Sequence, residues 1–138
     1  ARLAGTSAPD DRISDGKDIG PLLRGLPGAK SPHDAFYYYF RGHLQCVRSG
    51  KWKLHVARRE PIRNQRGQFR DIPARLFNLE TDIGESNDVA NDHPDVVAKL
   101  NALADKARQD LGDDATNTPG KNVREPGFVK DATPLTRK

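Results

Sequence analysis

Five consecutive aromatic residues constrain the fold of this chain more than any other feature. Residues 35–40 read AFYYYF, and aromatic side chains favour β-strands. Side chains alternate across a strand, so Phe36, Tyr38 and Phe40 face one side and the other two tyrosines face the opposite side. Apolar rings on both faces need cover on both faces. We therefore expect a central strand, or a strand that lies beside a larger partner.

Two shorter strands and a tight turn follow along the chain. Residues 44–48 and 52–56 are separated by a Ser-Gly pair, and Gly supplies the positive φ that a hairpin turn needs. In the second run, apolar residues alternate with Lys53 and His55, which is typical of a strand with one wet face. These residues predict an antiparallel hairpin.

The sequence after this hairpin is less regular. Residues 57–73 are basic and show no periodicity, so we expect a long loop there. Residues 75–79 predict a fourth short strand, with Leu76 on one face and Phe77 on the opposite face.

The clearest helix covers residues 94–111. Pro94 suits the first helical turn, and Gly112 suits the end of the helix. Apolar residues at spacings of three and four form one stripe along it, made of Val97, Leu100, Ala104, Ala107 and Leu111. Such a stripe predicts a helix that packs one face on a core.

The two ends of the chain are polar and rich in turn-forming residues. Residues 1–4 predict a helical end stopped by Gly5, and residues 19–24 predict a single helical turn capped by Asp18. Residues 113–138 contain three prolines and predict an extended tail.

The chain contains no Met and no signal peptide, so we expect residue 1 to be a cut point inside a longer protein. No apolar run approaches the roughly 18 residues that a transmembrane helix requires. No membrane partner is therefore predicted.

The formal charge of +4 hides a division between two segments. Residues 41–75 carry a net charge of +8, and residues 76–114 carry −7. Such a division has several interpretations: a basic arm for nucleic acid, two halves of one domain that attract each other, a basic surface for an anionic substrate, or an ordinary solvated surface.

Few residues are candidates for chemistry. Cys46 is the single cysteine and lies within a predicted strand, so we expect a buried, inert thiol rather than a nucleophile. The four carboxylates within residues 10–18 do not follow the spacing of an EF-hand loop. No two of the four histidines have the spacing of helical metal ligands. We therefore predict neither a catalytic residue nor a metal site in this chain.

Several stretches, in a fixed order, resemble the C-terminal region of the arylsulfatase-type sulfatases. The strongest is VRSGKWKLH at residues 47–55, which is similar to the family's Val-Arg-x-Gly-x-[Trp/Tyr]-Lys hairpin. The aromatic run resembles the strand that opens the family's C-terminal subdomain. The other matching stretches are LAG at 3–5, PDDR at 9–12, DGKD at 15–18, PLLRG at 21–25, LFNLE at 76–80, DIGE at 82–85, Asn87, His93-Pro94, and GKNVR at 120–124, which is similar to a bacterial sulfatase tail.

This resemblance implies an α+β fold, in which a small four-stranded antiparallel sheet is packed by one long C-terminal helix and docked on a larger α/β domain. Residues 1–34 would form the seam with that domain, residues 35–112 the C-terminal subdomain, and residues 113–138 the extended tail. The implied partner is an N-terminal sulfatase catalytic domain, and the implied location is periplasmic or secreted.

The resemblance also implies a sulfuric ester hydrolase whose catalytic groups lie outside this chain. The family's nucleophile is a formylglycine made from the Cys or Ser of a Cys/Ser-x-Pro-x-Arg motif, whereas Val-Arg-Ser-Gly follows Cys46. The family's calcium-binding carboxylates and sulfate-holding residues also lie upstream. We therefore expect calcium and formylglycine in a preceding domain, and no hydrolysis by this chain alone.

The role left for this chain is to support the active site and to border its mouth. The planar donors of Arg match the oxygens of a sulfate group. The implied substrate is an aryl sulfate or a sulfated carbohydrate, and the candidate substrate-binding residues are Arg41, His43, Arg58, Arg59, Arg63 and Asn64.

Two alternatives stay open. A stand-alone basic module would bind nucleic acid or a sulfated glycan through residues 41–75. The aromatic residues crowd into one strand, however, which fits core packing better than a base-stacking platform. The second alternative is a degenerate sulfatase end that has only an interaction role.

Overall fold

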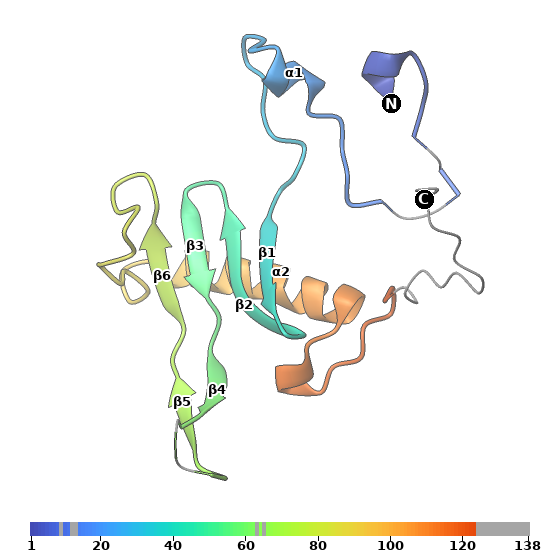
Figure 1. Cartoon of the computed structure of the whole chain (residues 1–138). Helices are drawn as coiled ribbons and strands as arrows, with labels where there is room; N and C mark the ends of the chain where they lie inside the picture. Colours follow the sequence, from blue (N-terminus) through green and yellow to red (C-terminus); the bar gives the residue numbers. More distant parts are fainter. Residues whose placement is uncertain (9, 12–13, 63, 65, 124–138) are drawn as a thin grey trace, which may run out of the picture.

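A four-stranded antiparallel sheet with one long helix on its face forms the centre of the molecule (Figure 1). This computed structural model describes residues 1–8, 10–11, 14–62, 64 and 66–123. The helix is α2 (Pro94–Leu111), and the sheet has the order β1-β2-β3-β6, with strands β1 (Phe36–Phe40), β2 (His43–Ser49), β3 (Trp52–His55) and β6 (Arg75–Asn78). The predicted α+β fold is confirmed.

The β2–β3 hairpin forms as expected, with its turn one residue later. Ser49 pairs with Trp52, so Gly50 and Lys51 occupy the turn. Gly50 has φ 56°, in the left-handed region that only Gly adopts without strain. The Ser-Gly pair therefore marks the turn because its second member supplies this conformation.

The core lies between the sheet and α2. Its buried side chains come from β2, β3, β6 and α2 and comprise Leu44, Val47, Leu54, Val56, Leu76, Leu100, Ala104 and Ala107. Burying each large aliphatic side chain is worth roughly 1.5–3 kcal/mol. Leu111 belongs to the same helical stripe but is 46% exposed, because the last turn of α2 extends past the edge of the sheet (Figure 1).

Strand β1 lies at the edge of the sheet, so the expectation of a central strand is wrong. Its pairing with β2 contains an irregularity between Tyr38 and Tyr39, and Tyr39 packs against the core. Phe36 and Phe40 are 55% and 63% exposed. Within the described residues, β2 is the only strand beside β1. The aromatic run therefore keeps an uncovered face, as the alternative of a larger partner requires.

The predicted long loop at residues 57–73 is wrong on both sides of its middle. Strands β4 (Arg58–Pro61) and β5 (Phe69–Ile72) form a separate two-stranded antiparallel ribbon, which extends beyond the main sheet as an arm (Figure 1). Neither strand of this arm contributes a residue to the core cluster, and the apolar Phe69 is 50% exposed. The alternation of apolar and polar residues that identifies a half-buried strand is therefore absent.

The start of the chain contains two short helical turns, as predicted. Helix η1 (Arg2–Ala4) ends at Gly5, which has φ 72°. Helix α1 (Gly20–Leu23) has Ile19 as its N-cap residue, so the predicted cap at Asp18 is wrong by one position. Asp18 Oδ1 still accepts a hydrogen bond of 2.8 Å from the Gly20 backbone N–H. None of the described helices is long and apolar enough to cross a bilayer.

The oppositely charged halves of the chain attract each other across the sheet. Lys53 Nζ lies 2.5 Å from Glu85 Oε1, and His55 Nε2 lies 2.6 Å from Glu85 Oε2. Lys51 Nζ lies 3.7 Å from a carboxylate oxygen of Glu80. Partial burial raises the pKa of Glu85, but the hydrogen bonds from Lys53 and His55 outweigh it, so the net pKa is lowered.

We predict that Glu85→Gln removes a pH-dependent part of the free energy of unfolding. A lowered pKa in the folded state stabilises the fold above the unfolded-state value of 4.5, and this contribution disappears as the pH falls through the lowered pKa. Urea unfolding of the chain should show a deficit of about 1 kcal/mol for the variant at pH 7 that vanishes in acid.

Glu80→Gln is the matched control, because the Glu80 carboxylate is more exposed and pairs at a longer distance. It should change stability by a few tenths of a kcal/mol at most. A Glu85→Gln deficit that persists unchanged at pH 3 would contradict the ion-pair explanation.

Candidate functional site

A hollow of about 370 Å³ opens between the β1–β2 turn and the base of the β4–β5 arm. The residues that line it come from these two places and from helix η2 (Asp114–Thr116), and comprise Phe40, Arg41, His43, Gln45, Arg58, Arg59, Glu60, Pro61 and Ala115. Four of the six predicted substrate residues meet there. Sequence reasoning missed the other five, Phe40, Gln45, Glu60, Pro61 and Ala115, because nothing in their local pattern points to a ligand.

The β1–β2 turn has a backbone that is unusual for its sequence. Phe40 pairs with His43, so the turn residues are Arg41 and Gly42, with φ of 51° and 78°. Positive φ at both central positions is the geometry of a type I′ hairpin turn. For Arg41 this conformation costs roughly 1–2 kcal/mol, so the surrounding structure must hold the turn in place.

Helix η2 holds this turn by close backbone contact. The Asp114 N–H donates a hydrogen bond of 3.0 Å to the Gly42 carbonyl. A Cβ atom at residue 42 would overlap the Asp114 carboxylate. The positive φ is therefore what requires Gly at residue 42, whereas the Asp114 carboxylate could turn aside to make room for a Cβ atom.

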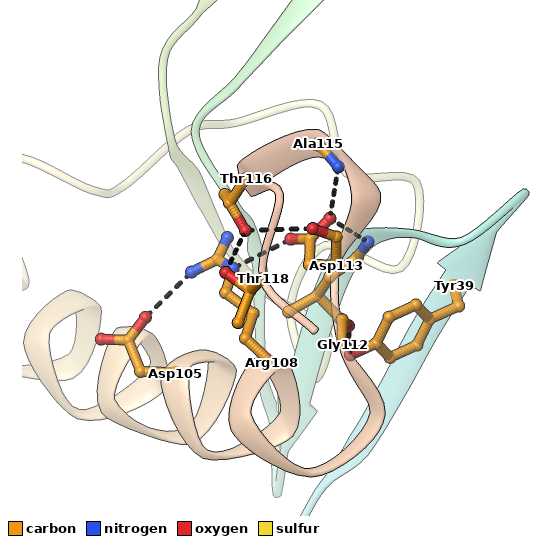
Figure 2. A network of polar contacts seen from close by, with 9 residues as sticks. Tyr39, Asp105, Arg108, Gly112, Asp113, Ala115, Thr116 and Thr118 are labelled. Atoms are coloured by element: carbon orange, nitrogen blue, oxygen red, sulfur yellow. Dashed lines mark hydrogen bonds and ion pairs between the residues drawn. The ribbon is translucent and has the colours of Figure 1, made fainter. Parts of the chain in front are cut away.

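Asp113 is a buried carboxylate that joins three parts of the structure (Figure 2). Its Oδ1 accepts hydrogen bonds from the backbone N–H groups of Leu44, at 3.3 Å, and Ala115, at 3.1 Å. Its Oδ2 accepts a bond of 2.9 Å from Arg108 Nε. The side chain thus links the end of α2 to β2 and to η2.

Neighbouring contacts complete this network. Arg108 Nη1 donates to Asp105 Oδ1 at 3.0 Å, and the Tyr39 hydroxyl donates to the Gly112 carbonyl at 3.0 Å (Figure 2). Burial lowers the pKa of Arg108, but the bonds to Asp113 and Asp105 outweigh this effect and raise it. Arg108 therefore stays charged beside the carboxylate.

We expected residues 113–138 to form an extended tail, but residues 113–118 fold back on the domain. The backbone groups of Asp113 and Thr118 bond to each other, with N···O distances of 2.9 and 3.1 Å, around the η2 turn. Local polar composition hid this turn, because its stability comes from the buried carboxylate rather than from an apolar pattern. Residues 124–138 of the predicted tail lie outside the described residues.

The arm contributes a paired arginine to the hollow. Arg58 Nη2 lies 2.6 Å from Glu60 Oε1, and Arg70 lies 3.4 Å from the other oxygen of Glu60. The hydrogen bond from Arg58 is the main reason why the pKa of Glu60 is lowered. The charge of Arg58 is therefore largely balanced by a neighbour on its own strand.

The remaining candidates from the arm differ in position. The Arg59 guanidinium lies over the Phe69 ring, 5.1 Å from its centroid, and Arg59 lines the hollow. Asn64, with φ 65°, lies in the turn of the arm and does not line the hollow. Arg63 lies outside the described residues.

A metal cluster and a reactive cysteine are two other kinds of centre that could carry chemistry. No three His, Cys, Asp or Glu side chains among them gather as a metal site would require. Cys46 is buried, and burial raises the pKa of its thiol. A buried thiol with a raised pKa is a poor nucleophile; the expected burial of Cys46 is confirmed.

Comparison with known proteins gives matches of one kind. The family described as the C-terminal region of aryl-sulfatase matches residues 31–130. The arylsulfatase of Hemicentrotus pulcherrimus is 48% identical over 65 residues, which cover 47% of this chain and 11% of that protein. Human arylsulfatase D is 28% identical over 135 residues, covering 80% of this chain and 22% of that protein. This chain thus spans less than a quarter of either relative.

A further relative and a solved structure also resemble this chain. The steryl-sulfatase of Mus musculus is 46% identical over 57 residues, covering 38% of this chain and 9% of that protein. A solved structure, whose title concerns metabolism of multiple glycosaminoglycans by Bacteroides thetaiotaomicron, has a TM-score of 0.59 at 22% identity. It covers 78% of this chain, and the match occupies 22% of that structure. At this identity the likeness concerns the fold.

We predict that Asp113→Ala destabilises the chain by about 3–5 kcal/mol, because it leaves the partly buried Arg108 charge and two backbone donors without their acceptor. Asp105→Ala removes the other carboxylate on Arg108, which is exposed, and should cost at most about 1 kcal/mol. Urea unfolding measures both. Equal losses in the two variants would show that burial of Asp113 does not matter.

Proposed function

This chain belongs to the family formed by the C-terminal region of aryl-sulfatases, and from that premise we propose that it supports and borders the active site of a sulfuric ester hydrolase. The observation that carries this proposal is the arginine-lined hollow, which lies at the same end of β1 as exposed Phe40. An anion-binding hollow beside an uncovered surface fits a site completed by another domain.

The chemistry of such an enzyme depends on groups that we place in a preceding catalytic domain. The family implies a formylglycine and a calcium ion, which supply attack on sulfur and neutralisation of the sulfate oxygens. Cys46 does not fit the formylglycine, because it is buried and its following residues lack the family motif. The residues of this chain therefore bind and orient the substrate: Arg41, Arg59 and His43 face the hollow and offer donors to an anion.

The partner that we propose for the uncovered aromatic surface is the same catalytic domain. Phe36, Tyr38 and Phe40 are exposed along the edge strand, and a row of exposed rings on a sheet edge invites association. On this view residues 1–34 form the seam that leads from the catalytic domain into β1.

A stand-alone nucleic-acid module is less consistent with the charges. Lys51, Lys53 and Arg58 of the basic segment are paired with carboxylates of this chain. Binding to a phosphate backbone needs several unpaired cations along one surface. The division of charge therefore serves mainly internal pairing and the hollow.

We expect the full-length protein to hydrolyse an aryl sulfate and the isolated chain of residues 1–138 to show no turnover. The upstream coding sequence should contain Cys/Ser-x-Pro-x-Arg, and replacing its Cys or Ser by Ala should abolish hydrolysis, because the nucleophile is lost. Release of a chromogenic phenol measures this. An upstream sequence without the motif would contradict the proposed activity.

We also expect the isolated chain to expose an apolar surface. It should bind a hydrophobic dye such as ANS, and Phe36→Ser with Phe40→Ser should reduce that binding several-fold, because the two rings are exposed. Ile83→Ser is the control, since Ile83 is 81% exposed but lies apart in the acidic half. A cooperative thermal transition of the unmodified chain without dye binding would overturn the docking proposal.

A further inference from the structure

We propose that the hollow is a second anion site, which binds a carboxylate or sulfate group that the substrate carries in addition to the ester being cleaved. This inference rests on the proposed function and specifies its substrate class: a sulfate ester with a ring body and a further negative group. The residues that bind the second anion are Arg41 and Arg59, with His43 beside them.

The balance of charges around the hollow supports this assignment. Three arginines line it, and the charge of Arg58 is balanced by Glu60 at 2.6 Å. Arg41 and Arg59 make no ion pair with any of the described carboxylates. Both guanidinium groups thus lack a close carboxylate partner among the described residues, which leaves their N–H groups available to an anionic ligand.

Both unpaired arginines are held by aromatic rings. The Arg41 Cζ lies 5.4 Å from the centroid of Phe40, and the Arg59 Cζ lies 5.1 Å from that of Phe69. Contact with a ring face orients the planar guanidinium, while its N–H groups point outward in the plane. An arginine fixed in this way is ready to donate two parallel hydrogen bonds to a carboxylate or sulfate.

The backbone conformation of the β1–β2 turn is a separate indication that Arg41 has a functional role. Arg41 has φ 51°, in a turn position where Asn or Gly would avoid the strain. Residues held in such a conformation often occur at functional sites. Here the contact of Asp114 with Gly42 maintains the turn and so places the Arg41 side chain at the hollow.

The shape of the hollow fits a small cyclic group. Its volume of about 370 Å³ is within the range of small-molecule sites, roughly 300–1,000 Å³. Phe40 and Pro61 supply apolar contacts beside the cations. This combination suits a sugar ring with an acidic substituent better than a wholly apolar body.

The experiment compares three substrates with the full-length enzyme: 4-nitrophenyl sulfate, a sulfated disaccharide with a uronate carboxylate, and a disaccharide in which a second sulfate replaces that carboxylate. Arg41→Gln and Arg59→Gln should each lower the ratio of kcat/KM between a matching disaccharide and 4-nitrophenyl sulfate about tenfold to a hundredfold, mainly through KM. The disaccharide whose ratio falls identifies the second group as carboxylate or sulfate.

Arg48→Gln is the matched control. Arg48 is exposed on the same sheet and donates to the Gly50 carbonyl at the opposite end of β2, so the ratio should stay within about twofold of the unmodified enzyme. Equal losses on all three substrates in the Arg41 and Arg59 variants would overturn the inference, because the arginines would then serve the cleaved ester or the fold.

A binding measurement separates the two proposals. If no substrate is hydrolysed, the proposed function fails, yet calorimetric titration of the full-length protein with either disaccharide still tests the hollow. Loss of affinity in Arg41→Gln and Arg59→Gln but not in Arg48→Gln supports the second anion site. Affinity that is unchanged in all three variants, or that is absent in the unmodified protein, overturns it.

Discussion

The ion pair between Asp113 and Arg108 fixes the turn that follows α2, and the geometry of the hollow depends on that turn. Removing a carboxylate from water costs several kcal/mol unless nearly all of its acceptor positions are used. Asp113 meets this requirement with three donors, from α2, β2 and η2. The core alone would hold α2 against the sheet, but this carboxylate fixes where the helix ends and where the chain turns back.

Only a few hydrogen bonds connect the Asp113 carboxylate to the hollow beside Arg41. Asp113 begins η2, and the next residue, Asp114, donates to the Gly42 carbonyl. Gly42 lies directly after Arg41, whose positive φ persists only because the turn is held. The same sheet edge also presents the exposed rings of Phe36 and Phe40. The supporting contact and the proposed recognition site therefore meet at the β1–β2 turn, next to Phe40, and the proposed docking surface extends from there along β1 to Phe36.

The sequence predicted the parts whose stability comes from apolar periodicity. Helix α2 has the predicted bounds, because its apolar stripe faces the core and Gly112 ends it. The β4–β5 arm could not be predicted in this way, since it has no core side. Asp113 was hidden for a similar reason: in a polar segment, nothing local distinguishes a buried carboxylate from a solvated one.

The candidate site shows that the sequence also could not predict which charged residues pair with each other. Arginines in residues 41–75 were expected at an anionic substrate, and sequence alone gave Arg41, Arg58 and Arg59 equal weight. The fold separates them, because Glu60 lies two residues after Arg58 and balances it, while the other two contact aromatic rings. A net charge of +8 therefore does not describe a uniform basic surface. Most of the cations whose contacts the structure describes serve the fold, and the proposed specificity would rest on Arg41 and Arg59, which make no described ion pair beside the hollow.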